Sequence, residues 1–168
     1  CKYDVFFGTD YHSHLGTKRG GLAMYDPEKG FSRQIHNIEN TPFRTKFEND
    51  LVKMNGTAGI GCISDTDPQP LLVRSHLGLF AIATVGIINN SDELEAKAFS
   101  GLGYQFMAMS SGKINSTEMT AALINRCNNL VDGIRYAQAA IEGSCTIMIL
   151  TKDGLLVARD KVGRLPIV

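Results

Sequence analysis

The chain has 168 residues, 43% of them hydrophobic, and its 17 basic residues balance its 17 acidic residues. A chain of this size buries a true core without disulfides or metals, so we expect one domain over residues 1–168. The absence of net charge argues against a nucleic-acid partner, and no apolar run reaches the length of a membrane span. We therefore expect neither nucleic acid nor membrane as a partner.

The cysteines are far apart in the sequence and form no CxxC pair, which argues against structural zinc and a disulfide framework. They are Cys1, Cys62, Cys127 and Cys145. We expect reduced thiols in a cytoplasmic protein. His12 and His14 lack a third ligand nearby, so we expect no metal. No Walker-type loop, dinucleotide fingerprint or phosphoribosyl-binding acidic pair is present, and we expect no cofactor.

The first eight residues alternate like a strand, with Tyr3, Val5 and Phe7 on one face and Gly8 at the end. This pattern predicts a strand over residues 1–8. Cys1 would then carry a thiol and an α-amino group on the same residue, and an amine with a pKa near 8 can serve as the base for the nucleophile beside it. The alternative is that Cys1 only marks the point at which the sequence starts.

The next elements follow from turn and cap signals. Residues 11–21 are polar and glycine-rich and predict a loop, and residues 26–30 predict a tight turn between strands 22–25 and 31–38. Thr41 and Pro42 then open a predicted helix that ends by Gly56.

The second half of the chain predicts more strands, separated by helices. Strands are expected at residues 58–63, 71–73, 79–88, 144–150 and 155–158. The strand at 79–88 is apolar on both faces, as expected for a strand covered on both sides. Helices are expected from Ser91, from Asn115 with Glu118 as a capping box, and from Asp132. This order fits two antiparallel sheets packed face to face with helices outside them.

Five motifs occur in an order that resembles one known family. They are Cys1, the loop of His14 and Gly16 leading to residues 21–23, residues 59–61 before Gln69 and Pro70, Gly86 with Asn90 after an apolar strand, and the closing run 158–166. The chain is similar over nearly its whole length to the glutaminase domain of class II glutamine amidotransferases. The resemblance implies an α+β fold, the four-layer αββα sandwich of N-terminal-nucleophile hydrolases. Family domains continue with more strands, so the chain is expected to be short at its C-terminus.

The resemblance implies that Cys1 attacks the side-chain amide of glutamine, with release of ammonia and then of glutamate. We expect Cys1 at the mouth of a cleft lined by Gly86 and the loop around His14. The family's oxyanion hole consists of an Asn side chain and a Gly backbone amide, and here that pair is Val85 and Gly86. The backbone donor is kept and the side-chain donor is lost.

The residues that recognise glutamine also differ from the family pattern. The family's Arg for the α-carboxylate corresponds to Ser64, and its Asp for the α-amino group corresponds to Ser116. In the loop, Leu15 stands between His14 and Gly16 where the family has Arg. Val85, Ser64 and Ser116 are all uncharged, and charge-assisted hydrogen bonds are the strong ones. The pattern therefore predicts weak binding of free glutamine.

Three hypotheses about function remain open at this point. The domain is an active glutaminase, an amide hydrolase or transferase with a different small-molecule substrate, or a catalytically inactive domain kept for binding or regulation. The lost Asn, Arg and Asp favour the second and third hypotheses. Any acceptor chemistry would have to come from elsewhere, so the expected partners are a small-molecule amide, a synthase domain or a second copy of the chain.

Overall fold

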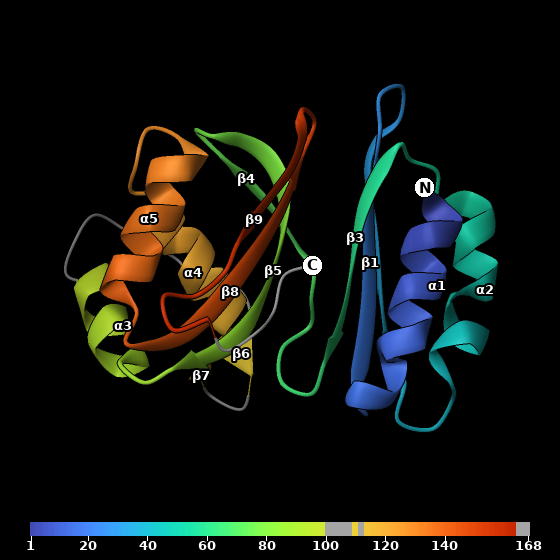
Figure 1. Cartoon of the computed structure of the whole chain (residues 1–168), viewed down its shortest axis with the longest axis horizontal. Coiled ribbons are helices and arrows are strands. Elements are labelled where there is room, and N and C mark those ends of the chain that lie inside the picture. Colours follow the sequence, from blue (N-terminus) through green and yellow to red (C-terminus); the bar gives the residue numbers. More distant parts are fainter. Residues whose placement is uncertain (100–108, 111–112, 164–168) are drawn as a thin grey trace. The chain divides into compact units, whose positions relative to one another are not determined.

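The structure is a computed structural model that describes residues 1–99, 109–110 and 113–163. The chain divides into two compact units, each built from several segments. Unit 1 contains residues 1–73, 79–83 and 148–156, and unit 2 contains residues 74–78, 84–147 and 157–168. Figure 1 shows the elements with their labels.

Unit 1 has an antiparallel three-stranded sheet in the order β2-β1-β3. The strands are β1 (Arg19–Asp26), β2 (Gly30–Asn37) and β3 (Ala58–Ser64). The β1–β2 hairpin confirms the predicted turn, since the carboxylate of Asp26 accepts hydrogen bonds from the backbone amides of Glu28 and Lys29 at 2.9 and 3.0 Å. Gly30 follows with a φ of 77°, which favours glycine.

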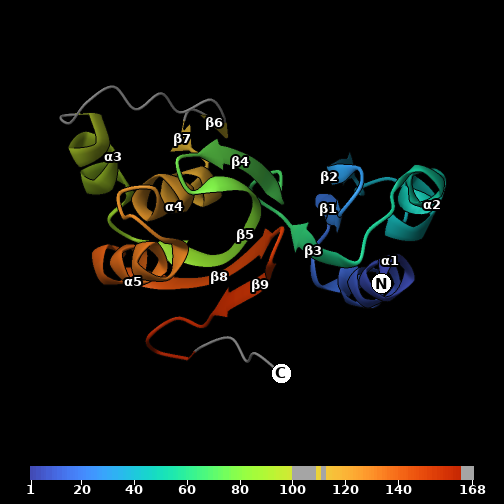
Figure 2. The ribbon, with the colours of Figure 1, turned by 90° about the horizontal axis from the view of Figure 1, so that it is seen from above.

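Two helices, α1 (Lys2–His12) and α2 (Phe43–Lys53), lie side by side on one face of this sheet (Figure 2). Phe43 and Phe47 of α2 are buried, and their rings stack with centroids 4.3 Å apart. Phe6 of α1 joins them, with its ring centroid 5.8 Å from that of Phe43. These aromatic rings anchor both helices to the sheet.

The helix α1 corrects the predicted strand over residues 1–8. The first helical bond runs from the amide of Val5 to the carbonyl of Cys1 at 3.0 Å, and Gly8 lies inside the helix. Phe6 and Thr9 are buried, with Val5 half-buried one position earlier. This spacing of three and four residues is helical, so the alternation of Tyr3, Val5 and Phe7 indicated the wrong period.

A second sheet has the strand order β4-β5-β8-β9. Its strands are β4 (Leu71–Ser75), β5 (Gly78–Ile88), β8 (Gly143–Thr151) and β9 (Gly154–Ala158). Within unit 1, residues of β5 and β8 pack on the three-stranded sheet through a buried cluster that includes Ala23, Ile60, Ala81 and Leu150. Unit 1 thus contains a helical layer, a sheet and part of a second sheet, which is three of the predicted layers.

Unit 2 carries the remaining helices. They are α3 (Ser91–Phe99), α4 (Ser116–Ile124) and α5 (Leu130–Ala140), and β6 (Met109–Ser110) pairs antiparallel with β7 (Lys113–Ile114). Asn115 caps α4 as predicted, because its side-chain oxygen accepts hydrogen bonds from the amides of Thr117 and Glu118. None of the helices in the described ranges has both the length and the apolar character that crossing a membrane requires.

The burial of β5 differs from the prediction of a strand covered on both faces. Phe80 to Thr84 are buried, whereas Val85, Gly86 and Ile87 are exposed. The apolar sequence alone did not reveal this change along the strand. The exposed end of β5 is the part that carries the predicted oxyanion residues.

Candidate functional site

Two of the predicted site residues, Gly16 and Ser64, lie where the loop after α1 meets the end of β3 in unit 1, and His14 is two positions before Gly16. The register pairs Arg19 at the start of β1 with Ser64 at the end of β3. A Cβ on the buried Gly16 would lie 2.6 Å from Ile63 Cγ2 and 3.4 Å from a carboxylate oxygen of Asp65. The loop after α1 therefore runs directly against the end of β3. We call His14, Gly16, Thr17, Ser64 and Asp65 the loop cluster.

Asp65 holds the loop cluster together. Its Oδ1 accepts hydrogen bonds from the backbone amides of Thr17 at 2.6 Å and Lys18 at 3.0 Å. These amide donors hold the pKa of the Asp65 carboxyl below its ordinary value. Two adjacent backbone amides that point at one oxygen form a small anion site, and here the chain's own carboxylate occupies it.

Ser64 and His14 each contact residues close to them in the sequence. The hydroxyl of Ser64 accepts hydrogen bonds from the amides of Thr66 at 3.3 Å and Asp67 at 3.2 Å, which fixes the turn after β3. His14 Nδ1 lies 2.8 Å from the carbonyl oxygen of Tyr11 at the end of α1. A short neutral hydroxyl already used by backbone amides cannot supply the charge that a carboxylate substrate needs.

Three further predicted residues, Val85, Gly86 and Ser116, lie around one contact in unit 2. The hydroxyls of Thr84 and Thr117 are 2.7 Å apart and buried, and they join β5 to the first turn of α4. Val85 directly follows Thr84, and Ser116 directly precedes Thr117. We call Thr84, Val85, Gly86, Ser116 and Thr117 the strand cluster.

Gly86 has a packing role within the strand cluster. A Cβ at this position would overlap the carbonyl oxygen of Ser144 on β8, so only glycine lets the two strands approach at this point. The side chain of Val85 is 49% exposed and offers no hydrogen-bond donor. The close approach of β5 and β8 is thus a structural reason for Gly86 that does not depend on catalysis.

Cys1 does not lie near the loop around His14, contrary to our expectation. It precedes α1 as the N-cap residue and is exposed, whereas His14 follows the other end of that helix. A helix of 11 residues separates them, which at about 1.5 Å per residue is roughly 16 Å. The α-amino group of Cys1 lies 3.1 Å from the carboxylate of Asp4. The catalytic assignment of Cys1 stays a prediction without a geometrical basis.

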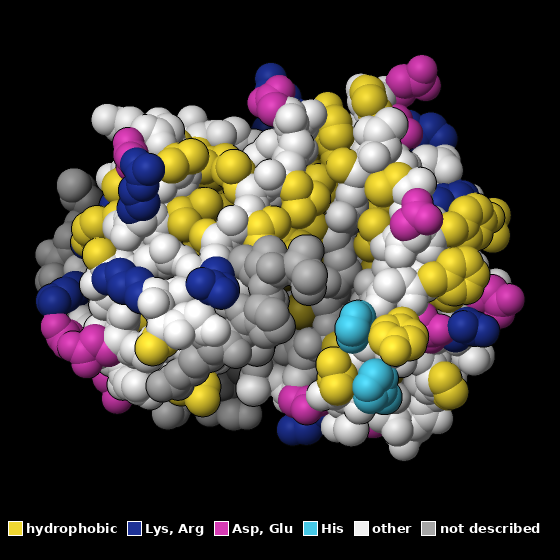
Figure 3. Space-filling view, in the orientation of Figure 1, with side chains coloured by type: hydrophobic (Ala, Val, Ile, Leu, Met, Phe, Trp, Pro, Cys, Tyr) yellow, Lys and Arg dark blue, Asp and Glu magenta, His cyan; other side chains and the backbone are white. Residues whose placement is uncertain are grey.

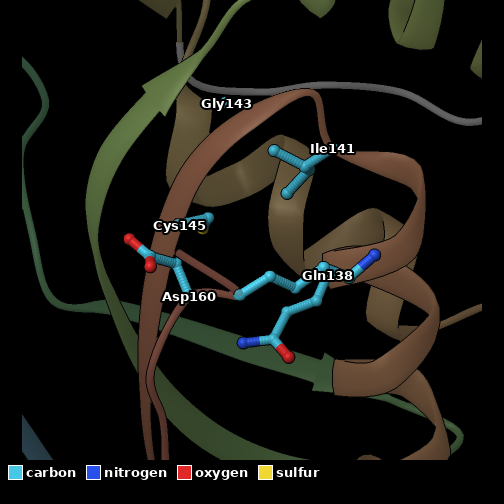
Figure 4. A pocket seen from close by; sticks show the side chains of 6 residues that line it. Gln138, Ile141, Gly143, Cys145 and Asp160 are labelled. Atoms are coloured by element: carbon cyan, nitrogen blue, oxygen red, sulfur yellow. The ribbon is translucent and has the colours of Figure 1, made fainter. Parts of the chain in front are cut away.

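A small cavity in unit 2 lies beside Cys145 and Asp160 (Figure 4). Its volume is about 30 Å³, enough for a water molecule but far below the several hundred Å³ of ligand pockets. Cys145 is buried, and burial raises the pKa of its thiol. Asp160 accepts a hydrogen bond from the amide of Gly163 and thereby closes the turn after β9. The cavity is therefore structural, and no group of three or more metal-ligating side chains occurs among the residues described.

The chain resembles two curated proteins over almost all of its length. It is 25% identical over 173 residues to the amidophosphoribosyltransferase of Methanocaldococcus jannaschii and 26% identical over 174 residues to that of Bacillus subtilis. Each alignment covers 97% of this chain and 35% of the relative. The chain thus spans about a third of the length of these relatives. No protein-family model matches it.

Solved structures agree with these sequence relatives. The B. subtilis glutamine phosphoribosylpyrophosphate amidotransferase complexed with ADP and GMP matches with a TM-score of 0.80 at 24% identity, over 96% of this chain and 35% of that one. A structure described as the allosteric regulatory enzyme of purine biosynthesis matches with a TM-score of 0.78 at 23% identity, over 95% and 35%. The chain is a class II glutamine amidotransferase-like domain. The predicted α+β fold of the N-terminal-nucleophile type is confirmed.

Several residues that shape this amidotransferase-like domain were not singled out in the sequence. The sequence patterns assign no role to Asp65, Thr84 or Thr117. No local motif marks a hydroxyl pair between residues 33 positions apart. The one sequence signal for Asp65 is that it is an acidic residue directly after the predicted site residue Ser64. In the closing run, residues 158–163 are described, whereas 164–166 lie outside the described residues.

Proposed function

We propose that this amidotransferase-like domain is a binding or regulatory domain that does not hydrolyse glutamine with Cys1 as nucleophile. The observation that carries the proposal is the position of Cys1, which caps a surface helix at the end remote from the loop of His14 and Gly16. A nucleophile must lie within about 3 to 3.5 Å of the carbon that it attacks, beside the groups that bind the substrate. An exposed helix cap remote from the loop lacks that arrangement.

The proposed correspondence of Val85 to the oxyanion-hole Asn supports the same conclusion. Valine has no polar hydrogen, so the tetrahedral intermediate would have only the amide of Gly86 as a donor. Losing one oxyanion donor typically slows acyl transfer by about a hundred- to a thousand-fold. Even a well-placed thiol would therefore be a poor catalyst at this site.

The loss of charge at Ser64 and Ser116 weakens substrate binding in addition. A glutamine zwitterion needs a cation for its carboxylate and an anion for its ammonium group. Charge-assisted hydrogen bonds are worth about 1.5 to 3 kcal/mol each, so two lost bonds weaken binding by roughly 3 to 6 kcal/mol. At about 1.4 kcal/mol for each factor of ten, this is at least on the order of a hundred-fold in affinity.

The test is a glutaminase assay at millimolar glutamine, followed by treatment with a diazoketone analogue of glutamine and intact-mass analysis. We expect no glutamate above the protein-free blank and no covalent adduct. Iodoacetamide serves as the control reagent, because it should alkylate the exposed Cys1 and so prove that a reactive thiol was present. Glutamate release that disappears in Cys1→Ser, together with an adduct on Cys1, would refute the proposal.

A gain-of-function variant tests the pocket correspondence separately. Val85→Asn, Ser64→Arg and Ser116→Asp together restore the groups that the family pattern contains. If the correspondence is right, the triple variant should bind glutamine more tightly than the unmodified chain, as measured by calorimetry. Unchanged affinity in a folded triple variant would show that these positions do not line a glutamine pocket.

The partners of the domain are also part of this proposal. About two thirds of each curated relative lies outside the region that the chain matches. If that remaining length contains a synthase domain, we propose that the present domain binds it and regulates its activity. Co-purification of the domain with a synthase module of such a relative would support this arrangement. If the two do not co-purify, the remaining candidate partner is a second copy of the chain.

A further inference from the structure

Asn55 is the only asparagine in the sequence that is followed by glycine. It lies in the short connection between α2 and β3, and both Asn55 and Gly56 are half-buried. In such a pair the backbone nitrogen of the glycine can attack the side-chain amide of the asparagine, because a residue without a side chain lets the two groups approach. The pair is therefore the position in the chain at which the loss of a side-chain amide is chemically easiest.

The backbone around this pair leaves the amide of Gly56 available for reaction. The amide of Met54 donates to the carbonyl of Asp50 at 2.8 Å, and the amide of Thr57 donates to the carbonyl of Tyr25 at 2.9 Å. Among the residues that the structure describes, the Gly56 amide between them has no protein acceptor. A nitrogen that is not held in a hydrogen bond within the fold can lose its proton and act as a nucleophile.

Packing against β1 explains why glycine stands at position 56. A Cβ on Gly56 would lie 2.7 Å from the carbonyl oxygen of Tyr25 and 3.1 Å from Met24 Cβ. The carbonyl belongs to the backbone of β1, so it cannot move aside without disturbing the sheet. The reactive pair is thus a consequence of how the connection packs, and replacing the glycine would disturb the fold rather than test the chemistry.

The ammonium group of Lys2 lies against the side chain of Asn55. Its Nζ donates hydrogen bonds to the carbonyl oxygen of Leu51 at 3.0 Å and to Oδ1 of Asn55 at 3.3 Å, and it is 5.4 Å from the centre of the Tyr3 ring. Figure 3 shows hydrophobic side chains along α1, and a lysine stem can lie along such a surface while its charged end reaches polar partners. A cation held at Oδ1 stabilises the negative charge that develops on this oxygen when a nucleophile adds to the amide.

We propose that Asn55 is a site of spontaneous deamidation, promoted by Lys2, and that the carboxylate formed there pairs with Lys2. The deprotonated nitrogen of Gly56 forms a bond to Cγ of Asn55, the bond from Cγ to Nδ2 breaks, and Nδ2 takes up the proton and leaves as ammonia. Water then opens the cyclic imide to aspartate or isoaspartate. The sum of the steps converts an amide and water into a carboxylate and ammonium. The chain's 17 acidic and 17 basic residues balance, so the product has one net negative charge.

The new carboxylate turns a neutral contact into an ion pair between the start of α1 and the end of α2. Hydrogen bonds between charged groups are stronger than those to a neutral amide. Lys2 and Asn55 are both half-buried, so salt screens the pair less than it screens a fully exposed one. Asn55→Asp should therefore raise the melting temperature by about 1 to 3 °C, but not in a Lys2→Met background. An equal shift in both backgrounds, or no shift in either, would overturn the pairing.

The test of the reaction is prolonged incubation of the folded chain at neutral pH, followed by ion-exchange chromatography and peptide mapping by mass spectrometry. We expect a more acidic form to accumulate, with the amide of Asn55 converted to an acid and part of the product present as isoaspartate. Asn40 is the internal control, because it is exposed but is followed by Thr41, whose β-branched side chain hinders ring closure. An amide that persists at Asn55, or equally fast conversion of Asn40, would overturn the proposal.

The variant Lys2→Met tests the part played by the ammonium group. Deamidation of Asn55 should slow by about two- to ten-fold, because the charge on Oδ1 in the intermediate is no longer stabilised. Lys53→Met is the matched control, since Lys53 is exposed in the last turn of α2 and its removal takes away a positive charge from the same segment. An equally fast or faster reaction in a folded Lys2→Met chain, or equal slowing in both lysine variants, would overturn the role of Lys2.

Discussion

The buried hydroxyl pair of Thr84 and Thr117 allows a quantitative test of the strand cluster. The oxygens are 2.7 Å apart, and Thr117 is fully buried. Valine has the same shape as threonine but no hydroxyl, so each single Thr→Val change leaves the partner without this bond. Losing one buried hydrogen bond costs about 0.5 to 1.5 kcal/mol net, and more where the remaining polar group is left unsatisfied. Replacing both by groups of the same shape is close to neutral for the contact itself.

We therefore expect each single variant to lower the free energy of unfolding by about 1 to 2 kcal/mol, and the double variant to lose clearly less than the sum. The coupling energy in the double-mutant cycle should be about 1 kcal/mol or more. Urea unfolding of the four proteins measures it, because with a slope of about 1 to 3 kcal/mol per molar urea each single change shifts the midpoint measurably. Strict additivity would refute the inference that these hydroxyls bond to each other.

Three further predictions concern the core, the loop cluster and the thiols. Phe47→Ala should cost about 3 to 5 kcal/mol because the ring is fully buried, whereas Val52→Ala on the exposed side of the same helix should cost little in urea unfolding. Asp65→Asn should flatten the acid side of the stability–pH curve. The pKa of Asp65 is lowered on folding, so its stabilisation is present above about pH 4 and is lost as pH falls through the folded pKa; an unchanged curve would count against this contact. Cys62 and Cys145 should resist iodoacetamide in the native state, since burial raises the pKa of Cys62 to about 12 and that of Cys145 as well; rapid labelling of either by peptide mapping would contradict their burial.

Much of the fold could be predicted because turns and caps are encoded locally. The turn at residues 26–30 contains an Asp side chain that bonds to nearby amides and a glycine with positive φ. Asn115 caps α4 with amides two and three residues away. Such signals need only a few neighbouring residues, so their reading does not depend on the rest of the chain.

The first segment could not be assigned in the same way, because two periods fit its apolar residues. Tyr3, Val5 and Phe7 match a strand, while Val5, Phe6 and Thr9 match a helix. The sheet decides between them, since Gly61 leaves room for the side chain of Thr9 against β3. That contact joins residues 52 positions apart and is invisible to any local pattern. The misassigned segment also carries Cys1, the predicted nucleophile.

The candidate site was predicted as one pocket, and its residues belong to a loop cluster in unit 1 and a strand cluster in unit 2. Gly16, Gly86 and Ser64 were chosen for their order in the sequence. The structure gives each a packing or hydrogen-bonding role that sequence order does not reveal. The order of the motifs therefore did not establish what these side chains do in the fold.

The backbone amides of Thr17 and Lys18 in the loop cluster are already occupied by an anion. They are directed at a carboxylate that belongs to the chain itself, through Asp65 Oδ1. A free carboxylate or phosphate arriving at this loop would compete with a carboxylate of the same chain, which has an effective concentration of about millimolar or more. Asp65 thus occupies both amides, so an external anion would reach them only if this side chain were withdrawn.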